Sequence, residues 1–202
     1  MKNCISMRAI RERDLATIWQ IGFREEAPEW KNWDGPYFDD YEPYKSLAEF
    51  AKAQAQHFLR DDRYAIFLGD QLIGIVSRYW ENEKTLWLEI GIVIFQAQYW
   101  SSGYGTEALR LWIDKTFADF PRLEHIGLTT WSGNERMMRA ALAAEALGCT
   151  EAEIAKSLSF YGAEGPLLIV AAGTSSSALA MSLEELERAA RAAGWVDVCK
   201  SV

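Results

Sequence analysis

An apolar run in the middle of the chain, Glu89-Ile-Gly-Ile-Val-Ile-Phe95, is rich in β-branched residues, and this composition predicts a buried strand. Residues 96–102 separate this strand from a segment whose apolar positions 108, 109, 112, 113 and 117 recur with the period of a helix. Gly103 and Gly105 lie just before these positions. The pattern therefore predicts a strand, a glycine-containing turn and a helix that begins near residue 103.

The rest of the pattern predicts antiparallel strands before this unit and another strand after it. Strands are predicted at residues 5–11, 64–68, 72–80 and 126–130, and Gly69-Asp70 predicts the turn of a hairpin. Helices are expected from the N-cap Asp14, from the capping box Ser46-Leu-Ala-Glu49 to about residue 60, and from Ser132-Gly-Asn134 onward. This order of elements indicates an α+β fold, because a doubly wound fold needs repeated strand–helix–strand units.

The end of the chain has a different composition. Eight of the nine tryptophans lie before residue 132, whereas alanine is enriched after residue 140. Strands are predicted at 157–161 and 166–172 with a turn at 162–165, and they complete a domain of residues 1–173. A linker at 174–177 and an amphipathic helix stopped by Gly194 make up residues 174–202. We interpret the change in composition as two sequence origins, that is, a fused, recombined or engineered chimera.

Composition and charge narrow the range of functions. Half of the 202 residues are apolar, which is enough for one substantial core. The net charge of −8 argues against a nucleic-acid backbone as the main partner and favours cationic ones. No apolar run approaches the about 18 residues of a membrane span, and the first residues lack a secretory pattern, so a cytoplasmic location is expected. Three cysteines without a CxxC pair or clustered histidines predict neither disulfides nor a metal site.

The predicted turn and helix start also have the features of an anion site. Gly103 and Gly105 let the backbone approach a ligand closely, and the N–H groups and positive dipole end of the first helical turn point towards it. The segment Gly103–Ala108 matches the dinucleotide pattern G-x-G-x-x-A as well, but that pattern requires glycines directly after the strand in a repeated βαβ array. A further alternative is a loose turn before a core helix, without any ligand.

Three segments carry a resemblance to a known family. They are Glu89-Ile-Gly-Ile-Val-Ile, Tyr99-Trp-Ser-Ser-Gly-Tyr-Gly-Thr-Glu-Ala and Leu128-Thr-Thr-Trp-Ser-Gly-Asn-Glu-Arg-Met-Met138. Together they resemble the acetyl-CoA-binding core of the GNAT family of N-acetyltransferases over residues 6–148, and are most similar to the branch that acetylates ribosomal-protein N-termini. The resemblance implies a mixed, mostly antiparallel, twisted sheet flanked by helices, here with an atypical C-terminal segment.

The resemblance also implies acetyl-CoA as the co-substrate and assigns residues to it. The family signature is Arg/Gln-x-x-Gly-x-Gly/Ala, in which Trp100 takes the first place here. Main-chain N–H groups of Ile94 and Phe95 are expected at the thioester and pantetheine, and Asn134 at the pantetheine arm, although Asn134 is also a good N-cap. The segment implied to hold the pyrophosphate comprises Ser101, Ser102, Gly103, Tyr104, Gly105 and Thr106.

Two residues are candidates for the proton transfers. Glu89 lies on the strand predicted at residues 89–95, where some acetyltransferases carry a glutamate that acts as the general base. The alternative is that Glu89 is a structural carboxylate. Many family members place a general-acid tyrosine seven residues after the asparagine, but this chain has Ala141 there. Tyr161 is a substitute candidate. Because a thiol of pKa about 8.5 leaves as thiolate at a cost of roughly 2 kcal/mol at pH 7, the replacement does not exclude catalysis.

An acidic and aromatic loop precedes the predicted helix at residue 46. Residues 24–42 combine seven carboxylates with five aromatic side chains. We interpret this loop as lining the site of a cationic amine, since carboxylates and aromatic faces both attract ammonium groups, and a structural lid is the alternative. The residues assigned to the acceptor are Glu25, Glu26, Glu29, Trp30, Trp33 and Tyr37.

The resulting hypothesis is an acetyl-CoA-dependent N-acetyltransferase that acts on a cationic small molecule or a protein N-terminus. The alternative is a coenzyme-A-binding regulatory module that lacks turnover. A third and more distant option is a tRNA deacylase, because residues 143–173 resemble a fragment of the editing deacylases related to prolyl-tRNA synthetase, with Lys156 matching a lysine of their site. The sequence leaves the acceptor open, and also whether the chain forms a homodimer.

Overall fold

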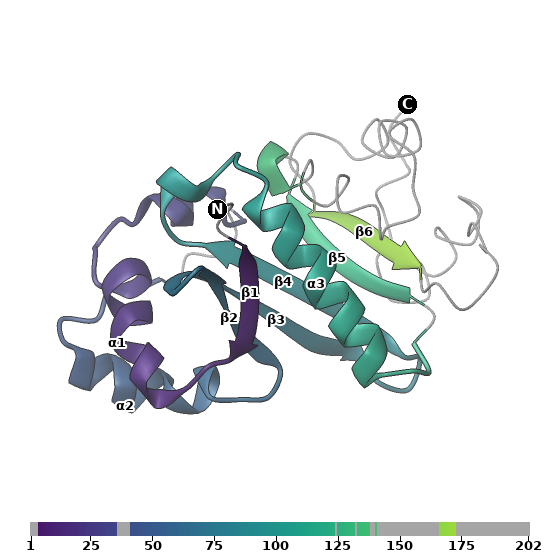
Figure 1. The fold of residues 1–202 in the computed structure, drawn as a ribbon, viewed down its shortest axis with the longest axis horizontal. Coiled ribbons are helices and arrows are strands. Elements are labelled where there is room, and N and C mark those ends of the chain that lie inside the picture. The colour runs from purple at the N-terminus through teal and green to yellow at the C-terminus, as the bar shows by residue number, and fades with distance from the viewer. Residues whose placement is uncertain are drawn as a thin grey trace.

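The computed structural model describes residues 4–35, 41–123, 125–131, 133–137, 140 and 166–172. Its six strands form one sheet in the order β1-β2-β3-β4-β5-β6 (Figure 1). They are β1 (Ile5–Ala9), β2 (Arg63–Leu68), β3 (Gln71–Asn82), β4 (Trp87–Ile94), β5 (His125–Trp131) and β6 (Pro166–Ala172). Only β4 and β5 pair in parallel among these strands. The predicted α+β fold with a mixed, mostly antiparallel sheet is therefore confirmed.

The α-helices α1 (Leu15–Ile18), α2 (Leu47–Phe58) and α3 (Tyr104–Asp119) accompany the sheet, and residues 135–137 and 140 are also helical, as predicted from Ser132-Gly-Asn134. A 3₁₀ turn, Glu12–Asp14, precedes α1, and a π-helical turn, Trp19–Phe23, follows it; two more 3₁₀ turns span Glu29–Trp33 and Ala97–Tyr99. No helix within the described residues is both long and apolar enough to span a membrane.

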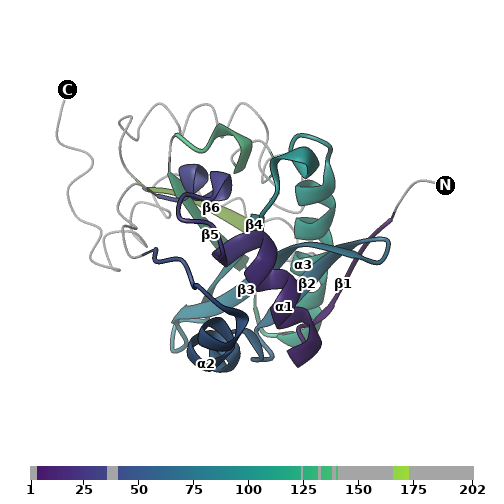
Figure 2. The same cartoon turned by 90° about the vertical axis from the view of Figure 1, so that its left-hand side faces the viewer.

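The sheet separates two apolar cores. On one face, α3 buries Leu109, Trp112 and Ile113 against the inner residues of β1 to β5. On the other face, α1 and α2 pack on β2 and β3 with Phe50 and Phe58 at the centre. Figures 1 and 2 show α3 crossing one side of the sheet while α1 and α2 lie on the other. Strand alternation explains the arrangement, because neighbouring residues of a strand point to opposite faces.

β4 and β5 meet at one recorded residue pair, Glu89 with Gly127. Beyond that pair β4 continues alongside β3 as far as Ile94, opposite Gly74. The close approach to β3 needs a glycine, since a Cβ at Gly74 would lie 2.2 Å from the carbonyl oxygen of Val93. The last residues of β4 therefore pair with β3. The opposite edge of β4, which faces β5, is unpaired beyond Glu89.

Most of the predicted elements are confirmed, with one difference at a helix start. The hairpin, the strands 126–130 and 166–172, and the N-cap of α2 are present, the last with Ser46 Oγ accepting the Glu49 N–H at 3.2 Å. Asp14 occupies the N-cap position of α1, as predicted, but its side chain makes no capping hydrogen bond to that helix. Its carboxylate reaches back to the N–H of Arg11 at 2.8 Å and pairs with Arg8, so the helical segment begins earlier, with the 3₁₀ turn.

The predictions for the end of the chain concern mostly residues outside the described ranges. The predicted strand 157–161, the turn 162–165, the linker and the final helix all lie there, as does most of the deacylase-like segment 143–173. Within that segment, β6 pairs antiparallel with β5 over seven positions, from His125 opposite Ala172 to Trp131 opposite Pro166. The prediction that residues 166–172 extend the sheet is therefore confirmed.

Candidate active site

The start of α3 has the backbone of an anion site. Gly103, the residue before the helix, is left-handed with φ 83°, and Ser101 also has a positive φ of 57°. The N–H of Glu107 donates to the carbonyl of Gly103 at 3.0 Å. Because this is the first turn of the helix, the N–H groups of residues 104–106 have no acceptor within it. These N–H groups and the positive end of the helix dipole favour an anion with several oxygens.

The end of β4 presents one backbone amide to the unpaired edge. The N–H of Phe95 donates to the carbonyl of Ile73 at 3.1 Å, so it belongs to the sheet. The carbonyl of Ile94 instead accepts the indole N–H of Trp100 at 2.7 Å. Neighbouring amides of a strand point to opposite edges, which directs the Ile94 N–H away from β3. The Phe95 N–H is therefore engaged in the sheet, whereas the Ile94 N–H has the orientation that an oxyanion donor needs.

Glu89 is the most deeply buried carboxylate of the described chain, with 1% of its surface exposed. Its Oε2 accepts hydrogen bonds from Tyr79 Oη at 3.1 Å and Thr129 Oγ1 at 2.8 Å, and its Oε1 accepts one from Trp87 Nε1 at 3.2 Å. Gly127 makes room for it, because a Cβ there would lie 3.0 Å from Glu89 Cγ. Donors from β3, β4 and β5 thus hold the carboxylate on the face opposite α3.

The turn Glu29–Trp33 contacts the chain on both sides of the unpaired edge of β4. The carbonyl of Trp33 accepts Asn134 Nδ2 at 2.6 Å and Trp131 Nε1 at 3.2 Å. The Trp33 ring meets the Trp100 ring edge-on at 6.2 Å, and the Arg136 guanidinium lies 4.3 Å from the first ring and 4.8 Å from the second. The acidic and aromatic loop therefore contacts both the end of β5 and the segment that leads into α3.

Asn134 has the predicted N-cap role. Its Oδ1 accepts the N–H of Met137 at 3.0 Å, which is the hydrogen bond of an N-cap. Its Nδ2 is already bonded to the carbonyl of Trp33. Binding a pantetheine arm through this amide would therefore require the contact with Trp33 to be exchanged or shared.

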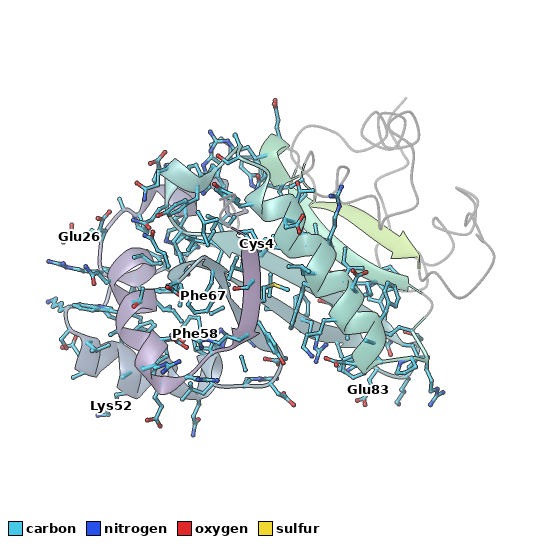
Figure 3. The ribbon with its side chains drawn as sticks, in the orientation of Figure 1. Cys4, Glu26, Lys52, Phe58, Phe67 and Glu83 are labelled. Carbon is cyan, nitrogen blue, oxygen red and sulfur yellow. The ribbon has the colours of Figure 1, made fainter. Side chains whose placement is uncertain are left out.

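The loop divides its residues between the interior and the solvent. Trp30 packs within 5.7 to 5.8 Å of Phe23, Tyr41 and Phe95, and its indole N–H donates to the carbonyl of Gly22 at 2.8 Å. The carboxylates predicted to attract an amine, Glu25, Glu26 and Glu29, are exposed, and Figure 3 shows Glu26 at the periphery. Trp30 packs against the interior, as a residue of a structural lid does, whereas the exposed carboxylates are accessible to a ligand.

Sequence reasoning missed the residues that surround Glu89, namely Tyr79, Trp87 and Thr129, and also missed Arg136. Side chains alternate along a strand, which places Trp87 and Glu89 on the same face, so this neighbour could have been predicted from the sequence. Tyr79 and Thr129 are close to Glu89 only because of the strand register, which pairs Tyr79 with Glu89 and Gly127 with Glu89. Tyr37 and Tyr161, which sequence reasoning assigned to the acceptor and the general acid, lie outside the described residues.

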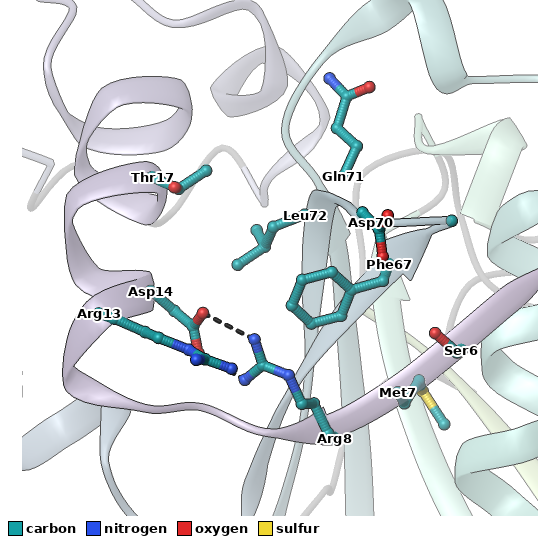
Figure 4. Close-up of a pocket in the computed structure, with 11 residues that line it drawn as sticks. Ser6, Met7, Arg8, Arg13, Asp14, Thr17, Phe67, Asp70, Gln71 and Leu72 are labelled. Carbon is teal, nitrogen blue, oxygen red and sulfur yellow. Dashed lines mark hydrogen bonds and ion pairs between the residues drawn. The ribbon is translucent and has the colours of Figure 1, made fainter.

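A separate open pocket of about 710 Å³ lies at the β1 edge of the sheet, between β1, the first helical turn and the β2–β3 turn (Figure 4). Arg8 pairs with Asp14 there through two hydrogen bonds of 2.6 and 2.8 Å and stacks on Phe67. The hydrogen bonds from Arg8 keep the pKa of Asp14 below its ordinary value. β2 and β3 separate this pocket from Glu89, so it is not part of the candidate active site.

Comparisons with known proteins agree with this geometry. The acetyltransferase (GNAT) domain model matches residues 5–149. A solved spermidine N-acetyltransferase from Vibrio cholerae, in complex with CoA and spermine, is 20% identical with a TM-score of 0.54, covering 69% of this chain and 79% of that chain. The structure of AAC(6')-Ib with ribostamycin and coenzyme A is 20% identical with a TM-score of 0.58, covering 86% and 99%.

At such low identity the two solved structures share the fold, and their ligands are properties of those proteins. A search of curated proteins finds no match. The domain match, by contrast, covers most of the chain and includes β1 to β5, the start of α3 and Asn134. The chain therefore belongs to the GNAT family of acetyltransferases.

Proposed function

We propose that this protein transfers the acetyl group of acetyl-CoA to the amine of a cationic acceptor. The observation that carries the proposal is the position of Glu89, a buried carboxylate at the residue pair that joins β4 to β5. The unpaired edge of β4 and the anion site at the start of α3 lie further along the same strand–helix unit. A co-substrate that lies along this edge would bring its thioester towards Glu89.

The residues at the start of α3 fit the pyrophosphate of coenzyme A. The N–H groups of residues 104–106 offer several donors, and the left-handed Gly103 turns the chain so that a helix can start there. The Ile94 N–H is the candidate oxyanion donor for the thioester carbonyl. The coenzyme supplies an activated acetyl group, and the protein's part is to bind it and to direct the amine.

Glu89 is the candidate base for that amine. A primary amine with a pKa of about 10.4 is only about 0.04% neutral at pH 7, so removal of its proton limits attack on the thioester. Hydrogen bonds to both carboxylate oxygens fix the orientation of Glu89. The thiolate leaves without a fixed general acid in this scheme, because Ala141 stands where many family members have tyrosine.

The acceptor class follows from charge. The chain carries a net charge of −8, and the exposed carboxylates Glu25, Glu26 and Glu29 lie in the loop that contacts the end of β5 through Trp33. Two similar structures hold spermine and an aminoglycoside ligand, which supports a polyamine or aminoglycoside-like acceptor. The resemblance to ribosomal-protein N-acetyltransferases supports a protein N-terminus as the other candidate.

One observation favours a second function. Ala141 replaces the usual tyrosine, and a chain that binds coenzyme A without turnover would have no need of a general acid. Such a chain would act as a coenzyme-dependent regulatory module. The two functions differ in whether amines accelerate release of the thiol.

The test measures thiol release from acetyl-CoA with spermine, an aminoglycoside and short peptides with free N-termini. We expect release that depends on at least one of these amines, and we expect Glu89→Gln to lower kcat/KM by roughly 10²-fold with unchanged coenzyme A affinity by calorimetry. Glu83→Gln, an exposed glutamate in the turn before β4, is the matched control. Coenzyme A binding without thiol release for any amine would favour the regulatory module, and absence of binding would overturn both functions.

A further inference from the structure

One hydroxyl joins the buried carboxylate of Glu89 to the protein surface. Glu89 is 1% exposed, whereas Tyr79, directly opposite on β3, is 43% exposed. Tyr79 Oη donates a hydrogen bond to Glu89 Oε2 at 3.1 Å. A carboxylate with so little exposed surface cannot take a proton directly from a ligand in solution. A proton that reaches it has to pass through one of the groups that surround it.

The three donors around Glu89 differ in their ability to pass a proton on. The indole N–H of Trp87 has no lone pair that can accept one, so Trp87 only orients the carboxylate. The hydroxyls of Tyr79 and Thr129 can both accept and donate. Thr129 is only partly exposed and projects from β5, whereas Tyr79 has the most exposed ring of the cluster. Tyr79 is therefore the member best placed to meet an acceptor.

We propose, on the basis of the proposed acetyl transfer, that the Tyr79 hydroxyl relays the acceptor's proton to Glu89. One N–H bond of the ammonium breaks as its proton bonds to Tyr79 Oη, and the former Oη proton bonds to Glu89 Oε2. Tyr79 ends neutral, Glu89 ends protonated, and the amine keeps the electron pair with which it attacks the thioester carbonyl. The reverse route returns the proton to water after the product has left.

The ordinary pKa values of the groups show what drives this relay. The net transfer runs from an alkyl ammonium, of ordinary pKa about 10.4, to a carboxylate whose acid has an ordinary pKa of about 4.3, so it is uphill by about 6 pKa units and goes forward only because the neutral amine is consumed by its attack on the thioester. The two transfers occur together, which avoids both a doubly protonated phenol oxygen and a free phenolate as an intermediate. A positioned proton acceptor of this kind contributes about 10²- to 10⁴-fold to a rate.

The decisive variant is Tyr79→Phe, which keeps the ring and removes the hydroxyl. At pH 7 we expect kcat/KM for spermine to fall about 10- to 100-fold, with unchanged affinity for coenzyme A by calorimetry. The deficit should shrink as the pH rises towards 10, because each pH unit raises the neutral fraction of the amine about tenfold. A merely structural role would lower activity by the same factor at every pH.

Two further variants separate a relay from positioning. Thr129→Val removes the other hydroxyl bonded to the same Oε2 and keeps the shape of the side chain, so its loss of activity should not vary with pH. The double variant Tyr79→Phe with Glu89→Gln should be no slower than Glu89→Gln alone, because both residues serve one proton path. Multiplying losses in the double variant would overturn the relay.

A measurement on the unaltered protein keeps the test independent of how Tyr79→Phe folds. In mixtures of H₂O and D₂O, kcat/KM should follow a bowed curve, since two protons move in one step, and a straight line would overturn the relay. Failure of the proposed function would give a different result. If the unaltered protein shows no amine-dependent thiol release, both acetyl transfer and the relay are overturned. Release with a pH profile that Tyr79→Phe leaves unshifted would overturn the relay alone.

Discussion

The two faces of the central sheet differ in what they bury. The face under α3 is mostly apolar around β3, β4 and β5, with Leu88, Ile90 and Trp112 among its least exposed residues, and its buried cation Arg78 pairs with Asp119. The opposite face of the same strands carries the hydrogen-bonded cluster of Glu89, Tyr79 and Thr129. Alternate residues of β4 therefore belong to different environments, apolar at 88 and 90 and polar at 89.

This difference separates stability from chemistry along a single strand. A buried carboxylate without hydrogen bonds would cost several kcal/mol, so the polar face depends on its three donors. The α3 face depends on close packing, in which truncation leaves a cavity. Substitutions on the α3 face should therefore change unfolding, and substitutions in the Glu89 cluster on the opposite face should change turnover.

The largest expected effect is on the α3 face. Trp112 is fully buried, and its indole N–H donates to the carbonyl of Ser77 at 2.9 Å. Trp112→Ala should lower the free energy of unfolding by about 3–5 kcal/mol, measured by urea denaturation. Leu111→Ala on the exposed side of α3, and Tyr79→Phe on the polar face, should each stay within about 1.5 kcal/mol. Equal losses for Trp112→Ala and Tyr79→Phe would contradict the separation of the two faces.

The next effect concerns the turn before α3. Gly103 and Gly69 both have a positive φ, and a Cβ at either would have nothing within 4 Å. Gly103→Val and Gly69→Val should each cost about 1–2 kcal/mol in unfolding, because both force valine into a left-handed backbone. Only Gly103→Val should weaken coenzyme A, by about tenfold in calorimetry, since Gly69 lies in the β2–β3 turn. A similar loss of affinity in both variants would point to general destabilisation.

A smaller effect is expected where α1 begins. The hydrogen bonds from Arg8 and the Arg11 N–H lower the pKa of Asp14, so its contribution is complete above the unfolded value of about 3.9 and is lost as the pH falls through the folded value. Asp14→Asn should lower the free energy of unfolding by about 1 kcal/mol at pH 7. The difference from the unaltered protein should shrink in urea titrations as the pH falls below the unfolded value and through the lower folded value. A constant difference at all pH values would contradict the role of the charge.

The sequence indicated the α3 unit accurately because its signals are local. Periodic apolar residues and Gly103 predict the helix and its start, and α3 begins at Tyr104. The polar cluster could not be found in this way, since Tyr79 meets Glu89 through a strand register that depends on the whole sheet. The position of Asp14 before α1 was predicted but its hydrogen bonding was not, because a carboxylate at a helix start can cap forwards or reach back to the preceding turn. That the Phe95 amide pairs with β3 could not be predicted either, because the edge to which an amide points depends on strand pairing.

The smallest expected effect tests whether the acidic loop acts on the acceptor or only covers the core. Glu25, Glu26 and Glu29 are exposed, so their replacement by glutamine should change stability little. If the loop attracts cationic amines, the triple variant should raise the KM for spermine about two- to fivefold at 10 mM salt, where charges act over about 30 Å, and hardly at all at 500 mM.

The matched control for this last prediction replaces Glu49, Glu81 and Glu83 by glutamine, which removes the same charge from exposed positions on α2 and before β4. A rise in KM that is equal in the two triple variants would mean that net charge alone attracts the amine. A fall in the midpoint of thermal unfolding with unchanged KM would mean that the loop is a lid, as the packing of Trp30 against Phe95 already allows. Only a rise in KM that is confined to the loop variant and abolished by salt would place the acceptor beside the acidic loop, on the face of the sheet that carries Glu89.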